Sequence, residues 1–216
     1  MKTFVIADIH GAHKVLLECF KKSGFDKKKD RLICLGDVCD RGWHTKECVD
    51  ELLTVRNLIY ILGNHDLWAM EWNLYGQISK DWQDNGGLET VKSYKGQGLP
   101  KEHMRLFAKA PLWYKDKNRL FVHGGFDSER SVEETPNQML LWDRTLLNQA
   151  QDLHNVSPDW KFGGYDEIFI GHTPTTTFGE DVPKKFCNVW AMDTGAGHMG
   201  CLTIMDVETK KFWQSE

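Results

Sequence analysis

Five short segments of the sequence carry residue types that bind metal ions in proteins, and each directly follows a short apolar run. In chain order they are DIHG at 8–11, GDVCDRG at 36–42, GNHD at 63–66, HGG at 123–125 and GHT at 171–173. Aspartate, asparagine and histidine supply the oxygen and nitrogen atoms that divalent cations coordinate. Each segment alone is more often a turn or a structural histidine. Together, and in this order, they predict a metal site.

The apolar runs are predicted to be β-strands, which places the five segments at strand ends. We expect these strands at residues 4–7, 31–35, 58–62, 120–122 and 167–170. Helices are expected between Gly11 and Gly24 and from about 45 to 53. Loops at the carboxyl ends of strands in an open α/β sheet converge on one region, where ligands bind. Asp8 and His10 can both turn toward that region if the backbone bends, and Gly11 permits the bend.

The rest of the chain is predicted to complete one layered domain. The stretch from 67 to 113 is expected to be mostly helical, with a break at Asn85–Gly87, and a further helix is expected from 139 to 153. An antiparallel meander is predicted near the carboxyl end, from strands at 189–192, 201–205 and 211–213. No repeat, low-complexity tract or linker divides residues 1–216. Alternating strands and helices, then strands alone, indicate an α/β domain with mixed sheets.

Composition and charge favour a globular protein and argue against a nucleic-acid-binding or membrane protein. With 41% hydrophobic and 27% charged residues, the 216-residue chain is typical of a globular domain. Its net charge of -4 at pH 7 gives no basic surface for nucleic acid or for an anionic membrane. No apolar run is long enough for a signal peptide or a membrane span. The six cysteines form no C-x-x-C pair, so we expect reduced thiols in a cytoplasmic protein with neither nucleic-acid nor membrane partners.

Two groups of residues outside the motifs are expected to have ordinary structural roles. The tryptophans of the helical middle are expected in the core or along a cleft, and they include Trp68, Trp72 and Trp82. The histidines without ligand spacing are expected to be solvated, and they are His13, His44, His103, His154 and His198. The oligomeric state is left open.

The ordered motifs resemble the signature of the phosphoprotein phosphatases, a group within the calcineurin-like metallophosphoesterases. That signature is Asp-x-His-Gly, Gly-Asp-x-x-Asp-Arg-Gly and Gly-Asn-His-Asp/Glu, followed by two later histidines. The likeness covers nearly the whole chain and is closest to the small bacterial and phage branch, of which bacteriophage lambda serine/threonine phosphatase is typical. Further likeness to that branch comes from segments at 24–30, 142–144, 171–174 and 193–196. The resemblance implies a four-layer α/β sandwich of mixed β-sheets flanked by helices.

The resemblance also implies two metal ions that share one carboxylate. The ligands of the first ion would be Asp8, His10 and Asp37, and those of the second would be Asp37, Asn64, His123 and His172. Two cations about 4 Å apart can bind phosphoryl oxygens and generate hydroxide from water near neutral pH. Three histidines are too many for a plain magnesium or calcium site, and the absence of cysteine ligands argues against structural zinc. Manganese is therefore expected, with iron as the alternative.

The residues that would act on the ester are implied in the same way. His65 would be the general acid that protonates the leaving alkoxide, and Asp40 would orient it and stabilise its charge. Arg41 and Arg144 would grip the phosphate, a task that suits a planar, permanently charged guanidinium. The alternatives are a structural role for His65 and a surface position for Arg144.

Two substrate classes fit these motifs. One is a phosphate monoester, in a phosphorylated serine/threonine protein or a small phosphoester, hydrolysed by attack of a metal-bridging hydroxide. The other is a dinucleoside tetraphosphate that is cleaved symmetrically. Leu62 replaces an arginine that is usual in the family, and Asp66 is the form usual in the nucleotide hydrolases. Those enzymes tend to lack a counterpart of Asp40, so its presence favours the monoester. A metal-free binding scaffold is disfavoured because every expected ligand is present.

Overall fold

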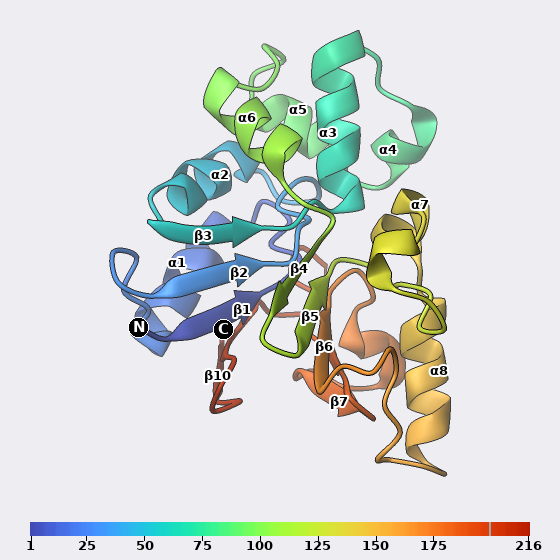
Figure 1. Cartoon of the computed structure of the whole chain (residues 1–216). Coiled ribbons are helices and arrows are strands. Elements are labelled where there is room, and N and C mark those ends of the chain that lie inside the picture. Colours follow the sequence, from blue (N-terminus) through green and yellow to red (C-terminus); the bar gives the residue numbers. More distant parts are fainter. Residues whose placement is uncertain (199) are drawn as a thin grey trace.

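Two five-stranded β-sheets face each other in the computed structural model, which describes residues 1–198 and 200–216 (Figure 1). The first sheet has the order β10-β9-β1-β2-β3. Its strands are β1 (Thr3–Ile6), β2 (Arg31–Cys34), β3 (Asn57–Tyr60), β9 (Thr203–Asp206) and β10 (Phe212–Gln214). β1, β2 and β3 run parallel, whereas β9 is antiparallel to β1 and β10 is antiparallel to β9.

The second sheet has the order β4-β5-β6-β8-β7. Its strands are β4 (Trp113–Asp116), β5 (Arg119–Val122), β6 (Glu167–Ile170), β7 (Lys184–Phe186) and β8 (Val189–Ala191). β5, β6 and β8 are parallel, and antiparallel strands β4 and β7 form the edges. The apolar runs of the sequence become these strands because a parallel strand is covered on both faces and therefore carries few polar residues.

Helices cover the outer faces of the sheets. Those packed with the first sheet are α1 (His13–Ser23), α2 (Thr45–Leu53), α3 (Asn64–Tyr75), α4 (Lys80–Asp84), α5 (Gly87–Ser93) and α6 (Lys101–Lys109). Those packed with the second sheet are α7 (Asn137–Trp142) and α8 (Thr145–His154). Short 3₁₀ helices occur at η1 (Val132–Glu134) and η2 (Thr175–Phe178). Gly24 adopts a left-handed backbone and ends α1, where the sequence predicted the stop.

A third apolar cluster fills the space between the two sheets. It includes Val5 and Ile33 from the first sheet and Phe121 and Phe169 from the second, and all four side chains are fully buried. The rings of Phe121 and Phe169 stack with their centroids 4.9 Å apart. The order helix, sheet, sheet, helix confirms the predicted four-layer α/β sandwich.

The predicted carboxyl-terminal meander is wrong for its first strand, while its last two strands, β9 and β10, form the predicted antiparallel pair. β8 pairs in parallel with β6 of the second sheet, whereas β9 and β10 belong to the first sheet. Every residue of β9 is buried because the strand lies between β1 and β10. The chain therefore crosses from one sheet to the other between β8 and β9, close to the strand ends that carry the motifs.

Two smaller expectations also differ from the structure. The single helix predicted from 139 to 153 is divided into α7 and α8, because Asp143 is extended and its carboxylate accepts the backbone N–H of Leu146. His103 is not solvated, since it is buried and its ring contacts Tyr94 and Asp50 at 2.9 Å each. Within the described residues, no helix is both long and apolar enough to cross a membrane.

Candidate metal centre

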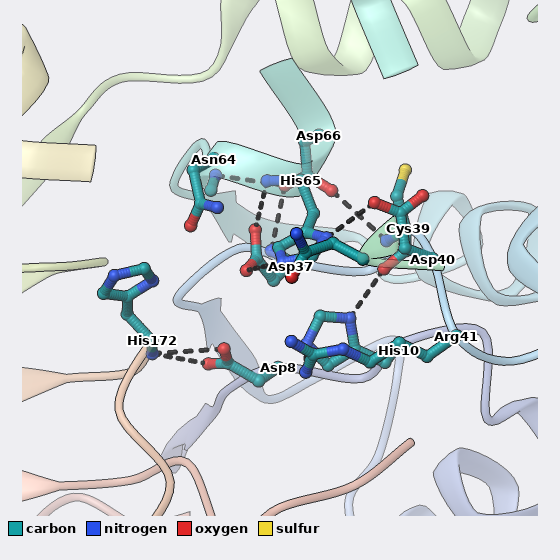
Figure 2. A network of polar contacts seen from close by, with 12 residues as sticks. Asp8, His10, Asp37, Cys39, Asp40, Arg41, Asn64, His65, Asp66 and His172 are labelled. Atoms are coloured by element: carbon teal, nitrogen blue, oxygen red, sulfur yellow. Dashed lines mark hydrogen bonds and ion pairs between the residues drawn. The ribbon is translucent and has the colours of Figure 1, made fainter. Parts of the chain in front are cut away.

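The motifs meet in the loops at the carboxyl ends of the parallel strands, and Figure 2 shows many of their side chains in one cluster. The predicted ligands follow β1 (Asp8 and His10), β2 (Asp37), β3 (Asn64), β5 (His123) and β6 (His172). All six are buried. The two sheets are joined directly at this point, because the backbone N–H of His172 donates to both carboxylate oxygens of Asp8 at 3.1 Å. The structure thus brings the six predicted ligands to one place.

Several residues of this cluster have left-handed backbone conformations. Positive φ angles occur at Asp8 (43°), His10 (47°), Asp37 (53°), Asp40 (75°), Arg41 (63°) and His172 (63°). For residues other than glycine, such conformations cost on the order of 1–3 kcal/mol each and persist only where the surroundings enforce them. Here the loops bind one another: the N–H of His10 donates to the carbonyl of Asp37 at 3.0 Å, and a Cβ on Gly11 would lie 2.5 Å from the carbonyl oxygen of Gly42.

One group of possible metal ligands consists of Asp37, His123 and His172, whose ligand atoms lie within 4.8 Å of one another. Nδ1 of His123 donates to the carbonyl of Leu35 at 2.7 Å, which leaves Nε2 facing the group. That Nε2 lies 3.3 Å from Oδ2 of Asp37 and 2.9 Å from Oδ1 of Asn64. Asn64 therefore joins this group, as the predicted second site requires.

A second group consists of His10, Asp37 and His65. Nδ1 of His10 donates to the carbonyl of Cys39 at 2.7 Å, so Nε2 is the ring nitrogen that can bind a metal ion. In the metal-free protein this Nε2 accepts a hydrogen bond from Arg41 at 2.7 Å. Asp8, which the sequence predicts as a ligand here, directs its carboxylate to the backbone of His172 instead. Asp37 belongs to both groups, which is the arrangement a bridging carboxylate needs. The ligand role of Asp8 stays a prediction.

The donor atoms fit divalent cations. Nε2 of His172 is buried and has no hydrogen-bond partner among the described residues, and a metal ion would supply one. Imidazole nitrogen, carboxylate and amide oxygen make up the set, without a thiolate. Such a set suits manganese, iron, cobalt, nickel or zinc better than calcium. Two metal sites with a shared carboxylate are therefore consistent with the chemistry of these side chains.

Burial and close charges set the protonation of the ligands. Burial, reinforced by the charges of His123 and Arg144, lowers the pKa of His172 to about 2, and burial likewise keeps the pKa of His10 well below its usual value. These imidazoles are neutral and ready to bind a cation. For His123, burial is outweighed by the carboxylates of Asp37 and Asp8, which raise its pKa to about 10. His123 therefore holds a proton that a metal ion must displace.

The predicted acid pair lies beside these groups. Nδ1 of His65 is 2.6 Å from Oδ2 of Asp40, and Nε2 of His65 is 3.9 Å from Oδ2 of Asp37. Both side chains are buried, and burial raises the pKa of Asp40 although its hydrogen bond with His65 and the charge of His65 oppose the rise. Because Nδ1 faces Asp40, Nε2 is the nitrogen that faces the metal groups. This orientation matches a carboxylate–imidazole pair that delivers a proton.

The two predicted phosphate-binding arginines differ in their surroundings. Arg41 is half-buried, and its Nη1 donates to Nε2 of His10 at 2.7 Å. Arg144 is exposed at the N-cap of α8, where its charge is close enough to lower the pKa of His172. Both guanidinium groups are therefore near the metal groups, Arg41 at the group that contains His10 and Arg144 at the group that contains His172.

Asp66 has a structural role that sequence reasoning missed. Its buried carboxylate accepts the backbone N–H groups of Asp37 (2.9 Å), Val38 (3.1 Å), Cys39 (3.4 Å) and Gly63 (3.0 Å) and the hydroxyl of Tyr60 (2.8 Å). Burial, together with the charge of Asp37, raises its pKa to about 6. Asp66 thus ties the loop that carries Asp37 to the start of α3. From the sequence alone, only the position of Asp66 in the third motif is visible, and that position indicates a substrate class.

Asp193 is a further buried carboxylate that the sequence analysis did not include in the site. It follows β8, its Oδ1 accepts the N–H of Gly195 at 2.9 Å, and burial raises its pKa to about 6. Its charge also raises the pKa of Asp8. The available signal was its place after an apolar run, the same pattern that identified the other motifs.

Comparison with known proteins agrees with this fold and cluster. A family model described as calcineurin-like phosphoesterase matches residues 1–199. The chain belongs to the calcineurin-like phosphoesterase family. It is 24% identical to serine/threonine-protein phosphatase 1 of Salmonella typhimurium, over 95% of this chain and 91% of that protein. It is 29% identical to an asymmetrical bis(5'-nucleosyl)-tetraphosphatase of a Geobacillus species, over 97% of this chain and 93% of that protein.

Solved structures show the same fold. A protein provisionally named as a diadenosine tetraphosphatase superposes with a TM-score of 0.73, at 14% identity, over 99% of this chain and 92% of that one. A cold-active protein-tyrosine phosphatase of a Shewanella species superposes with a TM-score of 0.62, at 17% identity, over 100% and 80%. The named relatives are thus divided between phosphatases and nucleotide hydrolases.

Metal binding is expected to tighten as the pH rises. His123 has a pKa of about 10, so it is protonated at neutral pH and must lose that proton to bind a cation. The apparent dissociation constant for manganese at this site should therefore fall by about tenfold for each pH unit between 6.5 and 8.5. Titration calorimetry in buffers of different ionisation enthalpy measures both the affinity and the protons released. Binding that is independent of pH and releases no protons would contradict this assignment.

Asp66→Asn is expected to destabilise the metal-free protein by about 2–3 kcal/mol, because an amide NH₂ would face backbone N–H groups and the negative charge that they stabilise would be lost. Urea unfolding measures the change in the free energy of unfolding. Tyr60→Phe is the matched control, since it removes one donor and leaves the carboxylate in place. If Asp66→Asn is as stable as the parent, the carboxylate does not hold these loops together.

Proposed function

We propose that the protein is a binuclear-metal phosphomonoesterase, related in activity to the serine/threonine phosphatases of the bacterial and phage branch. The observation that carries the proposal is the Asp40–His65 contact of 2.6 Å beside two groups of metal ligands that share Asp37. An alkoxide is a poor leaving group and needs a proton as the ester bond breaks. A phosphate chain is a good leaving group and has less need of an acid.

The residues proposed to hold the ions are those of the two predicted sites, Asp8, His10 and Asp37 for the first and Asp37, Asn64, His123 and His172 for the second. Manganese is the proposed metal, with iron as the alternative. When bound, such a pair of cations neutralises phosphoryl charge and makes a nucleophile available from water at neutral pH. The charge of the ions also offsets the mutual repulsion of the buried carboxylates.

The protein's own side chains are proposed to protonate the leaving group and to bind the phosphoryl oxygens. His65 donates the proton to the leaving alkoxide from Nε2, while Asp40 holds the ring through Nδ1. Arg41 and Arg144, one beside each metal group, bind the phosphoryl oxygens that the cations leave free. The proposed substrate is a phosphorylated protein or a small phosphate ester.

Hydrolysis of dinucleoside polyphosphates is the second candidate, and it is favoured by the 29% identity to the Geobacillus tetraphosphatase. Asp66 and Leu62 are the two sequence features that favour this candidate, and both side chains make structural contacts. Asp66 faces the loops and accepts backbone N–H groups, and Leu62 is buried in the apolar cluster of the first sheet. Neither side chain is therefore placed to select a substrate. The buried Asp40–His65 pair continues to favour the monoester.

His65→Asn is expected to lower kcat/KM for a phosphoserine peptide by two to four decades, the usual contribution of a general acid. The loss should be much smaller for an aryl phosphate and for a dinucleoside tetraphosphate, because their leaving groups need little protonation. The measurement compares the three substrates in one manganese buffer, with metal content determined for each protein.

Two results would overturn the proposal. Equal losses on all three substrates would show that His65 is not the acid. A preference of the parent enzyme for the dinucleoside of about a hundredfold, equivalent to about 2.7 kcal/mol, would identify the nucleotide hydrolase instead.

A further inference from the structure

The helical segment from Trp82 to Thr90 packs directly against the loop that carries Asp40 and Arg41. The N–H of Arg41 donates to the carbonyl of Gly86 at 3.1 Å. Gly86 has a φ of +94°, and a Cβ there would lie 2.5 Å from the backbone nitrogen of Arg41. Only glycine permits this approach. The break that the sequence shows between α4 and α5 therefore serves as a contact surface for the second motif.

Two side chains of this segment bind the carboxylate of Asp40. The hydroxyl of Thr90 accepts the N–H of Asp40 at 2.7 Å and donates to its Oδ1 at 2.7 Å. The indole Nε1 of Trp82 donates to Oδ2 at 2.7 Å, the same oxygen that contacts His65. A Cβ on Gly87 would lie 2.5 Å from the indole ring, so this glycine makes room for Trp82.

The hydrogen bonds to Asp40 from Thr90 and Trp82 are buried, so losing either one is costly. Asp40 and Thr90 are fully buried and Trp82 is 1% exposed, so no water replaces a lost donor. Asp40 also has a strained backbone, with a φ of +75°. Thr90 holds both the main chain and the side chain of this residue. Trp82 and His65 then fix the direction of Oδ2.

Ordinary core packing does not account for this arrangement. Trp72 lies beside Trp82, with ring centroids 6.0 Å apart, and is also buried. Among the described residues, the indole nitrogen of Trp72 makes no hydrogen bond with another side chain or carbonyl, whereas that of Trp82 bonds to Asp40. Packing needs only the ring, but the Asp40 contact needs the N–H.

We infer that Trp82 and Thr90 are positioning residues for the proposed acid, because they hold Asp40 in the orientation that directs His65 toward the leaving group. This inference rests on the proposed function, since it gives the two residues a role only if His65 donates a proton. It assigns a function to the segment between α3 and α6, which sequence reasoning interpreted as structural.

The test is the dependence of log kcat/KM on the pKa of the leaving group, measured with a series of aryl and alkyl phosphates on the manganese-loaded full chain. Trp82→Phe and Thr90→Val are expected to steepen the dependence and to lower kcat/KM for alkyl phosphates about tenfold, part of the 10²–10⁴ that a general acid contributes. Thr90→Ser keeps the hydroxyl and should restore the parent's slope. Trp72→Phe is the control for loss of a buried indole without loss of the Asp40 contact.

The outcomes separate the two proposals. If His65→Asn steepens the dependence while Trp82→Phe and Thr90→Val keep the parent's slope, the inference is overturned and the acid role of His65 stands. If His65→Asn leaves the slope unchanged, the proposed acid itself fails. If Trp82→Phe does not fold, the slopes of Thr90→Val and Thr90→Ser are compared instead. Equal slopes for these two variants would overturn the inference.

Discussion

The position of Asp37 is the constraint on which the rest of the site depends. Its carboxylate belongs to both groups of metal ligands, and its backbone is left-handed. Oδ1 of Asp37 accepts the N–H of His65 at 2.9 Å, while the N–H of Asp37 donates to Asp66 at 2.9 Å. The loop after β2 and the start of α3 are thereby locked together. Every proposed role in the site assumes this junction.

The same junction explains why the site is both strained and highly charged. Asp8, Asp37, Asp66 and Asp193 are all buried within one region, and burial with mutual repulsion raises the pKa of three of them. Hydrogen bonds from backbone N–H groups and the charge of His123 compensate only part of that cost. Two bound cations would complete the compensation. Stability of the loops and affinity for metal are therefore linked, as in other proteins whose ligands are brought together by folding.

Much of this account could be predicted from the sequence, because local patterns determine it. The strands are apolar runs, the motifs follow them directly, and Asp40 and His65 are in the second and third motifs. Apart from the division between α7 and α8, the features that the sequence does not predict depend on contacts between residues distant in the chain. β8 and β9 belong to different sheets although they are consecutive strands of the chain, and Asp66 binds residues nearly thirty positions earlier. Trp82 and Thr90 reach Asp40 across more than forty residues, and no spacing rule connects them.

Two cations are proposed to bind on either side of Asp37, and anomalous diffraction from manganese-loaded crystals tests this proposal most directly. We expect two anomalous peaks about 3.5–4 Å apart, both within coordination distance of the Asp37 carboxylate. One peak should lie next to His10 and the other next to His123 and His172. A single peak remote from Asp37, or no peak in this cluster, would contradict the account.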